Sequence, residues 1–214
     1  MFQKTGFIIL LLILVVAFLP LGHGAAAAKT PGNGDEFVLG LKVRFGGRYD
    51  DVRMCVASDP GTKGGTAADV SLFMDFGVNE DWFIHVDLPV FRPVLFALAF
   101  DMLQFEPSVG AHRRISTGDY VDVVVGPTLG VSLHYGPDYR SGQSAPDRGA
   151  SFFAMGPTFG GYFGVDFLRK GKAFNFQLGV SPYVTPLVGF GDGDDRRGVV
   201  IGGLLDALFQ WGAE

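Results

Sequence analysis

The sequence predicts an all-β protein: an eight-stranded antiparallel transmembrane β-barrel that follows an N-terminal signal peptide. Three observations support this prediction. They are an apolar residue at every second position through most of the chain, a second strand face made of small polar residues, and an apolar leader. A period of two places alternate side chains on opposite faces of a strand. It is clearest in the stretches 37–45, 70–78, 82–90 and 174–180.

The second face of these strands indicates their surroundings. In the stretch 69–77 it carries Asp69, Ser71, Asp75 and Gly77, and Lys and Glu are scarce on it. A sheet face in water usually carries many Lys and Glu residues. Small polar residues instead fit the interior of a narrow barrel, and bulky apolar residues fit a surface that faces lipid. The rival prediction is a secreted soluble barrel of the lipocalin type, which would turn the apolar face inward.

The leader has the features of a secretory signal peptide. Lys4 provides a positive charge, residues 7–19 are all apolar, and 25–28 offer small residues for cleavage. The apolar run is shorter than the ~20 residues that a spanning helix needs, so an uncleaved anchor is the less favoured alternative. We therefore divide the chain into a signal peptide at 1–28 and an outer-membrane barrel domain at 29–214.

Charge and cysteine content exclude several classes of function. Lys4 is the one charged residue of the leader, so its removal takes the formal net charge from −5 to about −6. A nucleic-acid partner would require a basic stripe, and we expect none. Cys55 is the single cysteine, so no intramolecular disulfide forms. No zinc spacing of His and Cys occurs, and we expect no catalytic residue, cofactor or metal.

Eight strands follow from the alternation and from the Gly, Pro and Asp turn signals between them. We place them at 36–46, 68–78, 81–90, 102–112, 120–135, 150–167, 173–188 and 198–211. The connections after the second, fourth and sixth strands are short, at 79–80, 113–119 and 168–172. The other connections are mostly longer, as at 47–67 and 136–149. Short turns on one side and long loops on the other are typical of outer-membrane barrels, in which the short side is periplasmic.

Two features of the strands carry specific expectations. The connection 91–100 is unusually apolar, and we favour an extension of the third and fourth strands over a short helix or a segment folded across the mouth. Three segments share a Pro-[Ser/Thr]-apolar-Gly pattern that begins at Pro107, Pro127 and Pro157. Because proline cannot donate to a sheet ladder, we expect a bulge or a bend at each.

Aromatic residues gather at the periplasmic strand ends, on the apolar face. Such a girdle of rings at the level of the lipid headgroups is expected for a barrel in a membrane. Its members are Phe37, Phe76, Trp82, Phe167, Phe174, Phe209 and Trp211.

The leader, the eight alternating strands, the short turns and the aromatic final strand together resemble the small bacterial outer-membrane barrels typified by OmpA, OmpX and OmpW. The resemblance implies a location in the bacterial outer membrane. It implies contact with outer-membrane lipids and lipopolysaccharide, and with the outer-membrane assembly machinery during biogenesis. In such barrels the last strand typically ends in an aromatic residue, whereas here 212–214 follow Trp211. We expect a monomer.

The inward face collects the polar residues that carry the candidate chemistry. Because the first strand neighbours the second and the eighth after closure, Lys42 and Arg44 are expected to meet Asp75 and Asp206. Buried charges must be paired, so we expect this luminal polar network to fill the interior. Its members are Lys42, Arg44, Asp69, Asp75, His85, Asp87, Glu106, His112, Asp122, His134, Asp166 and Asp206.

These expectations favour an integral barrel with a structural or passive-transport role. One alternative is a narrow, porin-like channel for small hydrophobic or cationic solutes, for which the apolar connection 91–100 could serve as a mouth. A second alternative is a barrel that hydrolyses lipids, because His85-x-Asp87 and Ser132-x-His134 pair residues of catalytic types. The alternation along these strands places all four residues on the inward face, away from acyl chains, so we do not expect an enzyme. The acidic segment 191–195 is a hairpin turn or a site that bridges divalent cations to lipopolysaccharide.

Overall fold

A computed structural model describes residues 37–50, 63–98, 103–118, 120–137, 151–167, 174–191 and 196–211. The predicted signal peptide, Cys55 and residues 192–195 of the acidic segment lie outside the described residues. The elements are β1 (Phe37–Asp50), β2 (Gly65–Gly77), β3 (Trp82–Pro89), α2 (Phe91–Ala97), β4 (Leu103–Phe105), β5 (Ser108–Ser116), β6 (Val121–Pro137), β7 (Ser151–Phe167), β8 (Phe174–Gly191) and β9 (Arg196–Trp211).

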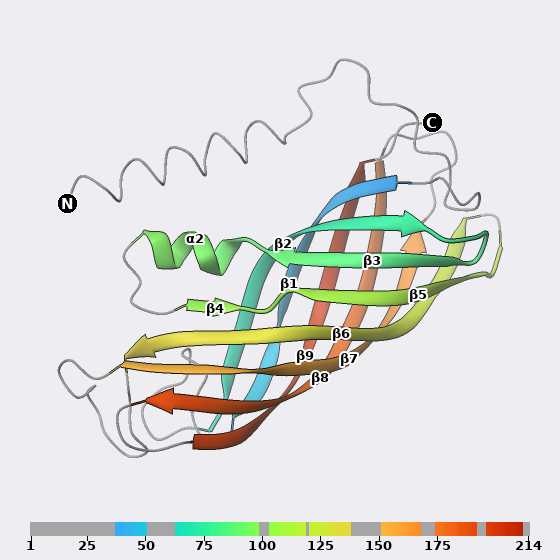
Figure 1. The fold of residues 1–214 in the computed structure, drawn as a ribbon. Helices are drawn as coiled ribbons and strands as arrows, with labels where there is room; N and C mark the ends of the chain where they lie inside the picture. The colour runs from blue at the N-terminus through green and yellow to red at the C-terminus, as the bar shows by residue number, and fades with distance from the viewer. Residues whose placement is uncertain are drawn as a thin grey trace.

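The strands form one antiparallel sheet that closes on itself (Figure 1). Neighbours around the ring are β6, β5, β3, β2, β1, β9, β8 and β7, and the pairing of β6 with β7 completes it. The short β4 and β5 pair with β6 in one unbroken register, from Leu103 opposite Tyr135 to Ser116 opposite Asp122. They therefore count as one interrupted strand. The predicted all-β, eight-stranded antiparallel barrel is confirmed.

The connection after β3 differs from its prediction. Phe91–Ala97 form the helix α2, so the favoured strand extension is wrong at this point. Pro89 and Pro93 explain the change, because neither residue can donate to a neighbouring strand. Among the described residues no helix is long and apolar enough to cross a membrane.

The fourth predicted strand also differs. It is interrupted at Glu106–Pro107 and continues to Ser116, four residues beyond the expected end. Pro107 lies in the interruption, because proline has no backbone N–H to donate to the neighbouring strand. At Pro127 and Pro157, β6 and β7 pair without a break from Val121 opposite Phe167 to Pro137 opposite Ser151. The pairing is interrupted on the other edge of each strand, at 126–127 toward β5 and at 156–158 toward β8. The register is the same on both sides of each interruption, so a bulge at these two prolines is wrong, while a bend stays a prediction.

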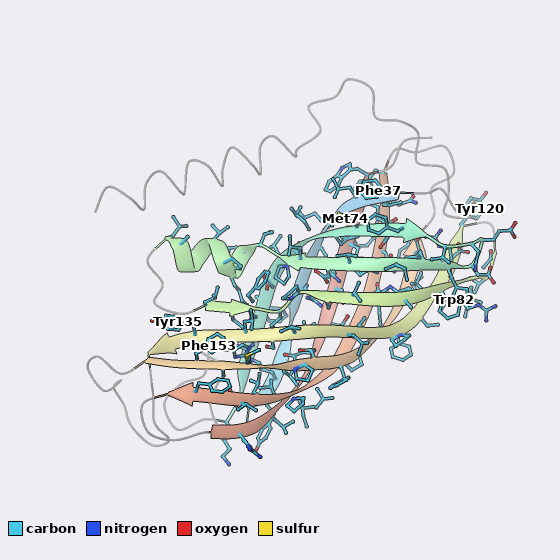
Figure 2. All side chains as sticks on the ribbon, viewed as in Figure 1. Phe37, Met74, Trp82, Tyr120, Tyr135 and Phe153 are labelled. Atoms are coloured by element: carbon cyan, nitrogen blue, oxygen red, sulfur yellow. The ribbon has the colours of Figure 1, made fainter. Side chains whose placement is uncertain are left out.

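The two faces of the sheet have opposite character. Outward side chains are large and apolar, and many are more than a third exposed; examples are Val43, Leu129, Phe163, Val180 and Leu205. In Figure 2, Phe37, Trp82 and Tyr120 lie near one end of the barrel, and Tyr135 and Phe153 lie near the other. Inward side chains are mostly polar and buried. The alternation in the sequence thus corresponds to an apolar exterior and a polar interior.

The seven residues of the predicted girdle all lie on the outer face. Phe37 packs on Phe76 with ring centroids 5.3 Å apart. Phe174 contacts both Trp211, at 6.2 Å, and Phe209, at 6.1 Å. Phe176 joins this row through Phe209 at 5.4 Å and Phe167 at 6.1 Å. Trp82 and Phe76 are about two-fifths exposed. The rings form rows around the end of the barrel that carries the short turns.

Candidate functional site

The barrel interior holds all twelve side chains of the predicted luminal network. Ten of them are buried, and Arg44 and Glu106 are largely buried, with 12% and 20% of their side chains exposed. They do not form a single cluster. The interior consists of a charged central layer, an aromatic stack beside it, a polar cluster toward the longer connections, and an apolar plug and an acidic cluster toward the short turns.

Asp87 organises the central layer. Its carboxylate forms an ion pair with the Lys42 ammonium, and the Arg44 guanidinium lies 3.4 Å from the same carboxylate oxygen. Arg44 also reaches Asp206 at 3.4 Å, and the Ser181 hydroxyl donates to Asp206. The expected pairing of Arg44 with Asp206 is present, because these residues are directly opposite each other on β1 and β9.

The expected pairing of Lys42 with Asp75 is wrong. Asp75 lies opposite Val38 in the β1–β2 register and opposite His85 in the β2–β3 register. Its carboxylate is 2.5 Å from Nδ1 of His85, and Nε2 of His85 is 3.1 Å from the Lys42 ammonium. Because an ammonium group only donates, Nε2 accepts and the His85 proton resides on Nδ1, facing Asp75.

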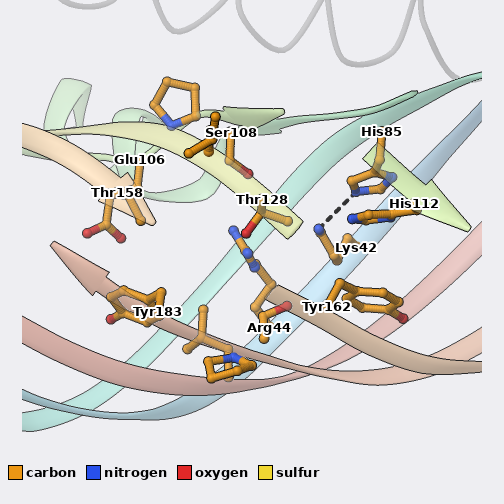
Figure 3. A pocket seen from close by; sticks show the side chains of 15 residues that line it. Lys42, Arg44, His85, Glu106, Ser108, His112, Thr128, Thr158, Tyr162 and Tyr183 are labelled. Carbon is orange, nitrogen blue, oxygen red and sulfur yellow. Dashed lines mark hydrogen bonds between the residues drawn. The ribbon is translucent and has the colours of Figure 1, made fainter. Parts of the chain in front are cut away.

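An aromatic stack crosses the interior beside these charges. Phe73, His85, His112 and Tyr162 follow one another at centroid distances of 5.1, 5.0 and 5.1 Å. Figure 3 shows His85, His112 and Tyr162 at the cavity, next to Lys42. The rings pack against glycines of the wall. A Cβ atom on Gly40 would overlap Phe73, and one on Gly110 would overlap His112. A Cβ atom on Gly164 or Gly179 would overlap Tyr162. Nε2 of His112 has no hydrogen-bond partner among the described residues.

An apolar plug, consisting of Phe73, Phe83, Val124, Tyr162 and Leu208, fills the interior on the side of the short turns. These side chains are at most 4% exposed. We did not predict the plug, since we treated the inward face as uniformly small and polar. The signal was present in the alternation, because Phe73 shares the face of Asp69 and Asp75, and Leu208 shares the face of Asp206.

A polar cluster on the other side of the central layer contains Ser132, His134 and Glu106. The Ser132 hydroxyl lies 2.7 Å from Nε2 of His134 and 3.0 Å from Oε1 of Glu106. Glu106 contacts the same His134 nitrogen, at 3.2 Å. In a nucleophilic triad the carboxylate holds the other ring nitrogen, so that the histidine can take the hydroxyl proton. The cluster lacks that arrangement, and Ser132 is fully buried.

The acidic cluster lies toward the short turns. Asp122 and Asp166 are directly opposite each other on β6 and β7. They share one cation: Nη2 of Arg114 is 3.3 Å from Asp166, and its Nε is 3.9 Å from Asp122. We had placed Arg114 in the turn, because the fourth strand was expected to end at residue 112. The continuation of β5 carries it into the interior instead.

A cavity of about 50 Å³ lies between the central layer and the polar cluster (Figure 3). Its lining includes Lys42, Arg44, Glu106, His112, Thr158 and Tyr183. A buried water needs roughly 10–15 Å³ of such space, so the cavity accommodates a few water molecules. Small-molecule sites are usually about 300–1,000 Å³. Within the described residues, no group of three or more His, Cys, Asp or Glu side chains is arranged to hold a metal ion.

Comparison with known proteins gives a likeness in structure alone. No protein-family model matches the chain, and no curated protein matches it. Among solved structures, the chain is similar to the crystal structure of Neisserial surface protein A (NspA). The two share 12% sequence identity, the match covers 81% of this chain and 96% of that one, and the TM-score is 0.44. The assignment of eight strands in a closed ring rests on the strand pairing of this chain itself.

Proposed function

We propose that the protein is a monomeric integral barrel of the bacterial outer membrane with a structural role and a closed interior. The single observation that carries the proposal is the combination of an apolar exterior with an interior filled by paired charges and an apolar plug. In this proposal outer-membrane lipids and lipopolysaccharide surround the mature barrel. The precursor is exported, and the outer-membrane assembly machinery inserts it.

The exterior supports placement in a membrane. Large apolar side chains such as Phe163 and Leu205 are 56% and 62% exposed, and they recur at every second position of neighbouring strands. Soluble monomers rarely expose apolar patches larger than a few hundred Å². A closed ring also satisfies its backbone hydrogen bonds internally, which the hydrocarbon layer demands.

The interior supports a closed rather than a conducting barrel. An eight-stranded barrel is just wide enough to hold its own side chains. Here Phe73 and Tyr162 project into the interior from β2 and β7, and Lys42 and Arg44 are held by carboxylates next to them. No hydrolytic step belongs to the proposal, because Ser132, His134 and Glu106 converge on a single ring nitrogen.

A narrow path for small cations is the second candidate, and one observation favours it. Among the buried and largely buried side chains that the structure describes, carboxylates outnumber Lys and Arg. The carboxylates are Asp50, Asp69, Asp75, Asp87, Glu106, Asp122, Asp166 and Asp206, and the cations are Lys42, Arg44, Arg48, Arg92 and Arg114. A surplus of carboxylates favours cations over anions in a pore.

Single-channel recording in planar bilayers tests the proposal. The refolded wild-type barrel is expected to give no conductance steps. Replacing Phe73 and Tyr162 together with Ala removes the plug and should produce steps. The matched control replaces Phe76 and Phe163, which lie on the same two strands and point outward, and should remain silent. Cation-selective steps in the wild type would contradict the closed interior and favour the second candidate.

A further inference from the structure

The barrel wall has a lateral gap on the side of the longer connections. The pairing of β2 with β3 stops at Ser71 opposite Pro89, while β2 continues to Gly65 alongside β1. On the other side of the gap, β4 pairs with β6 alone. Among the described residues, no strand therefore lies between the edges of 65–69 and 103–105. The helix α2 packs against both β4 and β2 and covers this place (Figure 1).

Arg92 of α2 fastens the helix across the gap. The amide of Val90 donates the last strand-like hydrogen bond, to the carbonyl of Val70 at 2.9 Å. Two residues further along each segment, Nε of Arg92 donates to the carbonyl of Ala68 at 3.1 Å. A side chain thus takes the place of the missing strand donor. The same guanidinium lies 3.7 Å from Asp69 and 3.6 Å from Glu106, one carboxylate from each side of the gap.

The helix is short, and the side chains described at its ends are partly exposed. It is seven residues long, and isolated helices shorter than about 12–15 residues are marginal in water. Phe91 and Leu98, at its two ends, are 42% and 44% exposed. The Arg92 side chain is 13% exposed and its guanidinium is always charged, so its burial depends on the carboxylates of Asp69 and Glu106.

The gap leads toward the luminal cavity. Glu106 contacts Arg92 on one side and lines the cavity on the other, together with Pro107 and Ser108 of the same interrupted strand. If α2 moves away, Asp69 and Glu106 both lose the Arg92 guanidinium and lie beside the opening. Glu106 keeps its contacts with Ser132 and His134, but the surplus of luminal carboxylates favours another cation in the place of Arg92.

We infer that α2 is a displaceable part of the wall, and that a cationic amphiphile from the surrounding lipid enters between β2 and β4 by replacing Arg92 between Asp69 and Glu106. The cationic headgroup takes the position of the guanidinium, and the alkyl chain extends through the gap toward the outer face. This inference rests on the proposed placement of the barrel in a membrane. Arg92 is then an internal competitor of the ligand, whereas an Arg92 that only stabilised the wall would not compete.

Photolabelling in phospholipid vesicles tests this inference with two matched probes. One is a dodecylamine that carries a diazirine near its ammonium group, at the end that enters the gap, and the other is the corresponding dodecanol. Both probes should label outward residues such as Leu205, because both dissolve in the bilayer. Only the amine should label the luminal side of the gap, around Ser71 and Ser108.

Three variants test whether luminal labelling by the amine depends on Arg92 and Glu106. Arg92→Ala removes the competitor and should increase labelling on the order of tenfold, because the amine no longer has to displace a guanidinium that is already held by both carboxylates. Glu106→Gln should decrease labelling by a similar factor. Arg113→Ala removes an exposed ion pair with Asp81 near the short turns and should change nothing.

The outcomes separate the two proposals. Outward labelling without a luminal preference for the amine overturns the gap as an entry site and leaves the membrane placement intact. Absence of outward labelling overturns the membrane placement itself. Unchanged luminal labelling in a folded Arg92→Ala variant also overturns the inference. The comparison of amine with alcohol needs only the wild-type protein, so it decides the matter even if a variant fails to fold.

Discussion

Asp87 illustrates how single residues hold the interior together. Its carboxylate is buried, and it neutralises Lys42 and part of the charge on Arg44. Removing one member of a buried ion pair leaves an uncompensated charge in a medium that solvates it poorly. Replacing both members with apolar side chains avoids that cost. An exposed ion pair, such as Arg113 with Asp81 at 3.2 Å, contributes far less because water screens it.

Asp87→Asn is therefore expected to lower the free energy of unfolding by about 3–5 kcal/mol. Urea titration of the barrel refolded into lipid vesicles measures this change. The matched control Asp81→Asn should cost less than about 1 kcal/mol. Adding Lys42→Met to Asp87→Asn should recover much of the loss, and a double variant as unstable as the single one would contradict the assigned pairing.

The elements of the barrel differ in how firmly their neighbours hold them. β6 and β7 pair without interruption over seventeen residues each, whereas β4 has three residues and a single partner strand. Pro107 separates β4 from β5, and the edge of β4 opposite β6 faces α2 instead of a strand. Local opening costs least where few backbone hydrogen bonds and few packed neighbours must be broken.

Amide hydrogen exchange should follow this difference. The amides of 103–105 are expected to exchange much faster than those in the middle of β6 and β7, because opening β4 breaks pairing on one side only. Mass spectrometry of the barrel in lipid vesicles resolves the two regions. The amides of β9 around Leu205 serve as the internal reference, because this segment pairs with β1 on one side and with β8 on the other. Equal protection of β4 and β6 would show that the wall has no weak point there.

For the whole molecule, the decisive property is which face of the sheet meets lipid. Leu205 lies midway along β9 and is 62% exposed, and its neighbours Phe45 on β1 and Val180 on β8 are also outward. The charged layer of Lys42, Arg44 and Asp206 lies at the same level on the inside. The proposed placement in a membrane removes this apolar exterior from water.

Leu205→Arg tests the orientation directly. In lipid vesicles a cation at this level should cost about 2–4 kcal/mol of unfolding free energy, because an arginine on the lipid face near the midplane is poorly solvated. Equilibrium refolding measures the difference. Tyr120→Arg, at an exposed position beside a short turn, is the matched control and should be nearly neutral. An equally neutral Leu205→Arg would mean that the outer face meets water.

The sequence by itself predicted eight strands and which positions face inward, because a period of two is a local property that neighbouring residues enforce. It also predicted the pairing of Arg44 with Asp206, since these residues lie on strands that closure makes adjacent. It missed the helix at Phe91–Ala97 and the interruption of the fourth strand.

The tertiary structure alone decided the rest. Lys42 meets Asp87, two strands away, because the registers of three strands bring Asp75 to His85 instead. The apolar plug forms because Phe73 and Tyr162, far apart in the chain, meet inside a narrow ring. The gap that α2 covers depends on where β3 ends relative to β2 and β4. Each of these contacts depends on the stagger of strands across the barrel, which no local pattern encodes.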